Sequence, residues 1–83
     1  MLHRYWFQFN QTSKPSILNT GCGITAHSEE DARQLLRDLV FPVFGDRDIA
    51  SVIEDVDLDA LDQGHVIPNM TSPFPRGVWF PLL

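Results

Sequence analysis

The chain has 83 residues, of which 43% are hydrophobic and 20% are charged, and it carries a formal net charge of −5. This composition excludes a disordered chain, and the length predicts a single domain over residues 1–83 with a small core. No apolar run approaches the ~18 residues that span a bilayer, so we expect no membrane partner. The lone Cys22 cannot form an internal disulfide and the first residues do not resemble a signal peptide, which together predict a cytoplasmic protein.

The acidic residues concentrate in residues 46–62. This window holds seven acidic residues and a single basic one, Arg47, so it carries −6 while the rest of the chain carries +1. Such a field repels phosphate backbones and attracts basic surfaces, so we expect no nucleic-acid partner. A solvated face that only aids solubility is an alternative interpretation of the same pattern. The seven acidic residues are Asp46, Asp48, Glu54, Asp55, Asp57, Asp59 and Asp62.

Residues 3–10 predict a strand, because aromatic side chains suit a pleated surface. Alternation places Trp6 on one face and three other aromatic residues on the opposite face. A polar hairpin loop is expected at residues 11–16, followed by a second strand at residues 17–26. The aromatic residues opposite Trp6 are Tyr5, Phe7 and Phe9.

The second strand carries Gly21 and Gly23 on one face, which leaves a bare patch of backbone. We expect Trp6 to cover this patch across the hairpin, although the close approach of a partner would need the same glycines. The glycines do not form a phosphate loop, because a further apolar stretch separates them from the helix. Cys22 faces the apolar side and is expected to be a buried hydrophobe. In the alternative interpretation it pairs with His65 as a Cys–His nucleophile.

Ser28 is expected to cap a helix whose first turn carries three acidic residues, which the positive end of a helix favours. The apolar residues that follow recur at the 3, 4, 7 spacing of one buried helical stripe. Pro42 and Gly45 are expected to end the helix. The stripe comprises Ala32, Leu35, Leu36, Leu39 and Val40.

The second half of the chain predicts two more strands. Residues 48–57 form the third, and acidic and apolar residues alternate strictly over residues 55–59, although Leu58–Leu61 could equally form one helical turn. A loop rich in Pro, Asn and Gly follows at residues 62–76, and residues 77–81 offer a short edge strand. The order β-β-α-β-β predicts an α+β fold, a small antiparallel sheet with one amphipathic helix on one face. The face of the sheet opposite the helix would be exposed to solvent or available to a partner.

The long loop carries apolar residues on a segment with little regular structure. A loop of this length in a small domain is often functional, and Met70 and Phe74 would then contact a partner. Alternatively the loop wraps the sheet and plugs the edge of the core. The plugging residues would be Val66, Ile67, Met70 and Phe74.

No metal or cofactor is expected. The string Asp55-Val56-Asp57-Leu58-Asp59 imitates the start of a calcium loop, but Ala60 stands where that loop needs glycine and Val66 where it needs glutamate. The three histidines are scattered along the chain, without the ligand spacing of a zinc site.

The strings "GCGITAHSEEDA", "HVIPNM" and "RGVWFP" resemble those of a family of short, uncharacterised bacterial proteins. The resemblance covers most of the chain and supplies no catalytic residues. The small size, the acidity and the lack of an active-site constellation also resemble bacterial immunity proteins, which neutralise toxic nucleases from neighbouring cells.

We therefore expect a non-enzymatic module that binds a basic protein partner, most concretely an immunity protein that blocks a nuclease-type toxin. Acidic residues would mainly speed the encounter, and apolar anchors would supply affinity. One alternative is a small enzyme that uses His65 with Cys22 or with an acidic residue. Another is a homo-oligomer, such as a homodimer, that pairs through the open face of the sheet. The predicted partner-binding residues are Asp46, Asp48, Glu54, Asp55, Asp57, Asp59, Asp62, Met70, Phe74 and Trp79.

Overall fold

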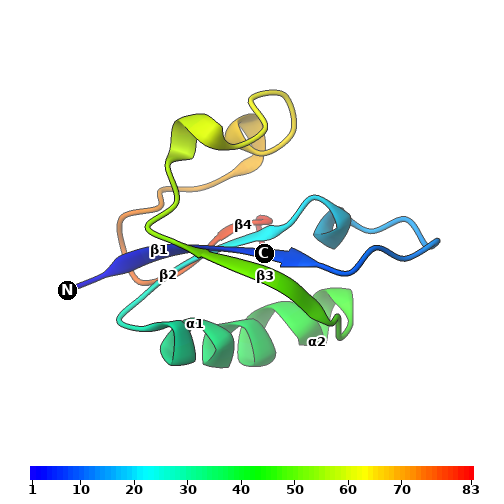
Figure 1. Ribbon diagram of the computed structural model, residues 1–83, viewed down its shortest axis with the longest axis horizontal. Helices are drawn as coiled ribbons and strands as arrows, with labels where there is room; N and C mark the ends of the chain where they lie inside the picture. Colours follow the sequence, from blue (N-terminus) through cyan, green and yellow to red (C-terminus); the bar gives the residue numbers. More distant parts are fainter.

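The computed structural model describes all 83 residues and confirms the predicted α+β architecture (Figure 1). The strands and the helix follow in the predicted order β-β-α-β-β. Four strands form one sheet in the order β3-β1-β2-β4, and every neighbouring pair is antiparallel. The strands are β1 (His3–Phe9), β2 (Cys22–Ala26), β3 (Ile49–Glu54) and β4 (Gly77–Phe80).

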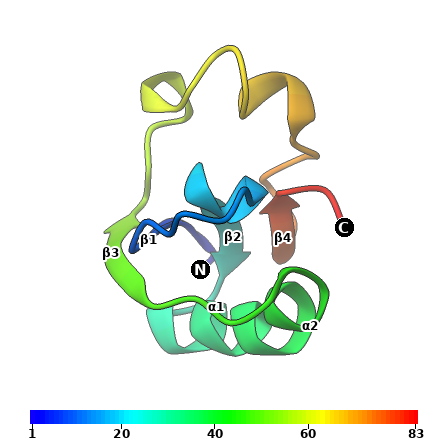
Figure 2. The ribbon, with the colours of Figure 1, turned by 90° about the vertical axis from the view of Figure 1, so that its right-hand side faces the viewer.

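The sheet is the middle layer of three (Figure 2). A continuous helical rod covers one face, and the chain between β3 and β4 covers the other. The rod consists of α1 (Glu29–Leu35), a π-helical turn (Leu36–Val40) and α2 (Phe41–Phe44). None of the helices combines the length and the apolar character that crossing a bilayer would require.

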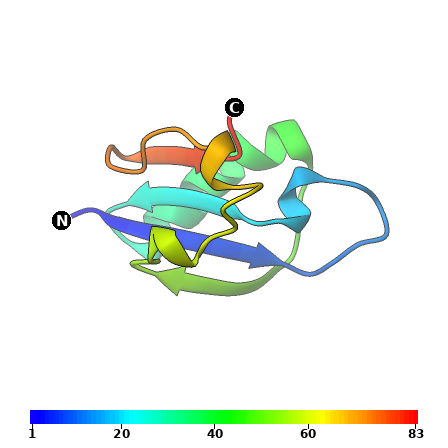
Figure 3. The same ribbon diagram turned by 90° about the horizontal axis from the view of Figure 1, so that it is seen from above.

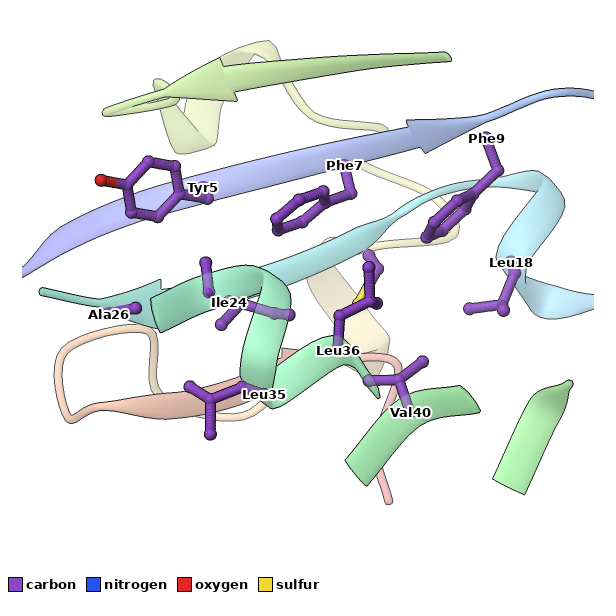
Figure 4. Packing of buried hydrophobic residues seen from close by; sticks show 11 residues of the cluster. Tyr5, Phe7, Phe9, Leu18, Ile24, Ala26, Leu35, Leu36 and Val40 are labelled. Atoms are coloured by element: carbon purple, nitrogen blue, oxygen red, sulfur yellow. The ribbon is translucent and has the colours of Figure 1, made fainter. Parts of the chain in front are cut away.

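The larger core lies between the sheet and the helix (Figure 4). The aromatic face of β1 and the apolar face of β2 meet the buried stripe of the helix there, as their periodicities predict. Its members are Tyr5, Phe7, Phe9, Leu18, Cys22, Ile24, Ala26, Ala32, Leu35, Leu36 and Val40.

The helix begins where predicted but ends later. Ser28 is the N-cap, and its hydroxyl accepts a hydrogen bond from the Asp31 N–H at 3.1 Å. The prediction that Pro42 helps to end the helix is wrong. Pro42 has no N–H and its ring crowds the carbonyl of the preceding turn, and the chain accommodates it by widening into the π-helical turn just before it. The helix ends at Gly45, whose φ is +94°.

The wider turn also moves Leu39 out of the buried stripe. The Phe41 N–H donates to the carbonyl of Leu36, five residues back, so the local repeat is longer than in an α-helix. Val40 is consequently fully buried, whereas Leu39 is 43% exposed. The prediction that Leu39 is buried is wrong for this reason.

The second face of the sheet is covered, contrary to the expectation of an open face. Residues 56–70 cross it (Figure 3). Val66, which belongs to this segment, is fully buried against the sheet. Ile67 and Met70 pack against the same cluster, which confirms that the loop wraps the sheet. The prediction that Phe74 also plugs the core is wrong, because its side chain is 73% exposed. The homo-oligomer alternative relied on an open face that this fold does not have. The crossing segment contains two 3-10 helices, Leu58–Ala60 and Ile67–Asn69.

Two tryptophans form the centre of this second core. Trp6 of β1 and Trp79 of β4 stack over the intervening strand β2, with ring centroids 5.8 Å apart. A Cβ atom at Gly21 would collide with the Trp6 ring, and one at Gly23 would collide with the Trp79 ring. Trp6 therefore covers Gly21 as predicted, but Trp79 covers Gly23. The bare patch of backbone is occupied within the chain itself.

The second strand is shorter than predicted. It begins at Cys22, and Ile17–Asn19 form a 3-10 helix instead of its first residues. The Ser16 hydroxyl accepts a hydrogen bond from the Leu18 N–H at 3.2 Å. A side chain that bonds nearby backbone in this way favours a turn over extended pairing.

The third strand also ends earlier than predicted. Asp55 follows β3 with a left-handed φ of +53°, so residues 55–59 are not extended. The Asp57 side chain then accepts a hydrogen bond from the Asp59 N–H and starts a helical turn. The alternative of one turn near Leu58–Leu61 is therefore confirmed.

An ion pair ties the start of the helix to the chain that enters β4. The Arg76 guanidinium donates to both carboxylate oxygens of Asp31, with Nε 2.9 Å from Oδ2. The His27 N–H donates to the same carboxylate at 3.0 Å. These hydrogen bonds, chiefly those from Arg76, hold the pKa of Asp31 well below its usual range.

We predict that Gly23→Ala lowers the free energy of unfolding by about 1–3 kcal/mol, because the new methyl group displaces the Trp79 ring. Gly64→Ala is the matched control, since its Cβ would meet nothing closer than an Asp62 oxygen at 3.5 Å. It should change stability by less than about 0.5 kcal/mol. Urea unfolding followed by tryptophan fluorescence measures both. Equal stability of the two variants would show that Trp79 does not lie on Gly23.

We predict that Arg76→Gln destabilises the fold at neutral pH and that the loss disappears in acid. A carboxyl group with a lowered pKa stabilises the fold above its unfolded pKa of about 3.9, and it loses that contribution as the pH falls through its folded value. The difference in unfolding free energy between wild type and variant should therefore shrink steadily as the pH falls below about 3.9, and it should vanish only when the pH passes the folded pKa of Asp31. Arg37→Gln removes the same charge away from Asp31 and should show no such convergence. A loss that stays constant down to about pH 2 would contradict the assignment.

Candidate functional site

The seven acidic residues of the window 46–62 are all exposed. They lie just before β3, at its end, or on the segment that leaves β3 to cross the sheet (Figures 1 and 2). β3 is an edge strand, so no further strand shields them. We name this set the acidic edge: Asp46, Asp48, Glu54, Asp55, Asp57, Asp59 and Asp62.

At the end of β3, two of these residues contact the start of β1. The His3 Nδ1 atom lies 2.9 Å from Asp55 Oδ1 and 3.8 Å from Glu54 Oε1. The Tyr5 hydroxyl donates to Glu54 at 3.4 Å. The strand register, which pairs Tyr5 with Glu54, brings the groups together. Burial first, and then the negative charge of Glu54, raise the pKa of Tyr5.

His3, Glu54 and Asp55 could hold a divalent cation, because one ligand atom from each lies within 4.8 Å of the others. Imidazole and carboxylate ligands suit zinc or manganese. No sequence pattern predicts this group, because His3 and Asp55 are 52 positions apart. The contact between His3 and Asp55 explains the arrangement without an ion, so we assign no metal here.

Two other acidic residues shape the backbone of the crossing segment. Asp57 caps the helical turn that follows it. The Asp62 carboxylate accepts hydrogen bonds from the Gly64 N–H at 2.8 Å and the His65 N–H at 3.0 Å, and it lies 2.9 Å from the His65 ring nitrogen. These contacts, chiefly that with the His65 ring, lower the pKa of Asp62.

The remaining carboxylates, those of Asp46, Asp48 and Asp59, take part in none of the ion pairs of the molecule. The only cation of the window, Arg47, is turned inward. Its guanidinium donates to the Asn19 side chain at 2.8 Å and to a backbone carbonyl, and it lies over the Phe9 ring. The negative charge of the acidic edge is therefore left largely uncompensated.

Cys22 and His65 do not form a catalytic pair. Cys22 is fully buried on the side of the sheet that faces the helix, and burial raises the pKa of its thiol far above the usual value. His65 is exposed on the segment that covers the opposite face. The Cys–His alternative is wrong because the sheet lies between the two side chains.

The three apolar residues predicted to bind a partner occupy different environments. Trp79 is fully buried in the second core, so it is a structural residue and not a surface anchor. Met70 is half-buried against the same cluster. Phe74 is 73% exposed, but the neighbouring Pro73 accepts a hydrogen bond from Thr25 of β2, which places Phe74 away from the β3 edge. Of the predicted partner-binding residues, only the acidic ones and Phe74 are therefore exposed.

The largest hollow of the surface, about 900 Å³, lies between the loop at residues 12–17 and the chain at residues 43–47. Its lining combines the apolar residues Ile17, Val43 and Phe44 with polar ones, and no sequence pattern points to it. Neither Cys22 nor His65 lines this hollow or the two smaller ones.

No family model, curated protein or solved structure matches this chain. The resemblances to short bacterial proteins and to immunity proteins therefore stay predictions from the sequence.

We predict that the Cys22 thiol of the folded protein reacts with maleimide only through unfolding, since the side chain is buried. Labelling should accelerate in parallel with the unfolded fraction as urea is added. Cys22→Ala should cost about 1 kcal/mol of stability and leave partner binding unchanged. Rapid, stoichiometric labelling of the native protein would contradict the buried position.

Proposed function

We propose that the protein is a non-enzymatic module that binds a basic protein partner through the acidic edge. One observation carries the proposal. The carboxylates of Asp46, Asp48 and Asp59 face solvent without a cationic partner, while Arg47 is turned toward the body of the protein.

Exposed carboxylates without cationic partners repel each other in the free protein, and a basic partner relieves that repulsion. The main gain is in the association rate, which opposite charges raise most strongly at low salt. An exposed apolar side chain next to the acidic edge could add to the contact with a partner. Ile53 of β3 is 44% exposed between the acidic residues.

The most concrete version of the proposal is an immunity protein that blocks a nuclease-type toxin. A nuclease binds the phosphate groups of its substrate with basic side chains. The carboxylates of the acidic edge would form ion pairs with the same basic side chains and so block the substrate. The proposal places the protein in the cytoplasm, where a lone thiol such as Cys22 stays reduced.

Two double variants that change the net charge equally test the proposal. Asp48→Asn with Asp59→Asn removes two charges from the acidic edge. Glu30→Gln with Asp38→Asn removes two charges from the exposed side of the helix. None of these carboxylates takes part in an ion pair, so both variants should stay within about 1 kcal/mol of the wild type.

Proteins captured from a lysate of the native host by the immobilised wild type would be titrated singly against both variants at several salt concentrations. We predict a basic partner whose association rate falls about fivefold for the acidic-edge variant, with a shallower salt dependence, and is unchanged for the helix variant. A partner that binds both variants equally would contradict the proposal, as would a partner that is itself acidic.

A further inference from the structure

The two edges of the sheet differ in what lies beside them. At β4, the Trp79 carbonyl accepts a hydrogen bond from the Thr71 N–H at 3.0 Å, so the preceding loop occupies part of that edge. Beyond β3 there is no strand, and the ribbon shows no segment alongside it (Figure 3). Alternate N–H and C=O groups of β3 therefore point away from β1 without a partner strand.

β3 itself is suited to receive another strand. It contains no Lys, Pro or Gly, residues that protect many edge strands from pairing. It carries the β-branched residues Ile49, Val52 and Ile53, and Ile53 is 44% exposed. An irregularity in its pairing with β1 lies near its start, which leaves Ser51–Glu54 as the regular part of the edge.

Acidic residues stand at both ends of this edge. Asp48 precedes β3, and Glu54 and Asp55 end it. If two copies paired antiparallel through β3, Asp48 of one copy would lie near Glu54 or Asp55 of the other, and like charges would oppose the pairing. A segment with basic residues at both ends would instead place positive charges beside these carboxylates, and the opposite charges would favour the pairing. The charges therefore disfavour a second copy and favour a basic strand.

We propose that the open edge of β3 is where an extended segment of a basic protein adds as a fifth strand. The inference rests on the proposed function and specifies how the partner binds. Backbone hydrogen bonds would hold the segment along β3. Lysine or arginine residues about 20 Å apart would fix its position, since that is roughly the length from Asp48 to Glu54 at ~3.3 Å per residue.

Three synthetic peptides test this mode of binding. The first has about six alternating threonine and valine residues, with lysines at both ends, to match the length of an average strand. The second replaces a central residue with proline, which keeps the charge but prevents regular pairing. The third carries glutamates in place of the lysines. Only the first should bind. It should slow hydrogen exchange of the β3 amides that face away from β1 by about tenfold or more.

Variants of Ile53 give a matched pair on the protein side. Ile53→Lys places a positive charge on the edge and should abolish binding of the lysine peptide. Ile53→Thr keeps a β-branched, uncharged side chain and should retain most of the binding. Both variants should fold, because Ile53 is partly exposed on an edge strand.

The outcomes separate this inference from the proposed function. If the proline peptide binds as well as the first peptide, strand addition is wrong, while the acidic edge still binds basic chains. If neither lysine peptide binds, the strand inference fails, and the captured partner alone decides the proposed function. If the protein alone sediments as a dimer that Ile53→Lys dissociates, a second copy occupies the edge and the inference is overturned.

Discussion

The stacking of Trp6 on Trp79 over two bare glycines is the interaction on which the rest of the structure depends. The two indoles come from strands that are not neighbours, and they meet only because Gly21 and Gly23 have no side chains. Burying each indole removes roughly 200 Å² from water, worth about 5 kcal/mol. Small domains have a net stability of only about 5–10 kcal/mol, so losing this platform would leave residues 56–70 without a surface to pack on.

The stacked Trp6 and Trp79 also determine where the acidic side chains of the crossing segment lie. Val56, Leu61 and Val66 point from the crossing segment into the second core, and the acidic residues between them point outward. The alternation of acidic and apolar residues after β3 therefore reflects a segment that covers a sheet on one side. Because β3 is an edge strand, the acidic residues at its two ends are not covered by a further strand, and those of the crossing segment follow directly after it. A chain with one small sheet thereby has two cores and still presents an open strand edge.

Much of the fold could be predicted because it depends on local periodicity. Aromatic alternation in β1 and the cap at Ser28 indicated their elements directly, and the α+β order followed from them. The misplaced Leu39 could not be predicted in this way, because the π-helical turn is a response to a proline three residues later. The contact between His3 and Asp55 depends on strand register, and the burial of Trp79 depends on strand order. The acidic residues of the candidate site were predictable from composition alone, whereas the open edge beside them was not.

Solvent paramagnetic relaxation, measured by NMR with a soluble gadolinium chelate, tests most directly the claim that the second core turns the acidic edge outward. The indole protons of Trp79 and the methyl protons of Val66 should be relaxed as weakly as those of the core beneath the helix. The side-chain protons of Asp48 and Asp59, and the outward amides of β3, should be among the most strongly relaxed. Strong relaxation of Trp79 and Val66, with protection of the β3 amides, would contradict the account.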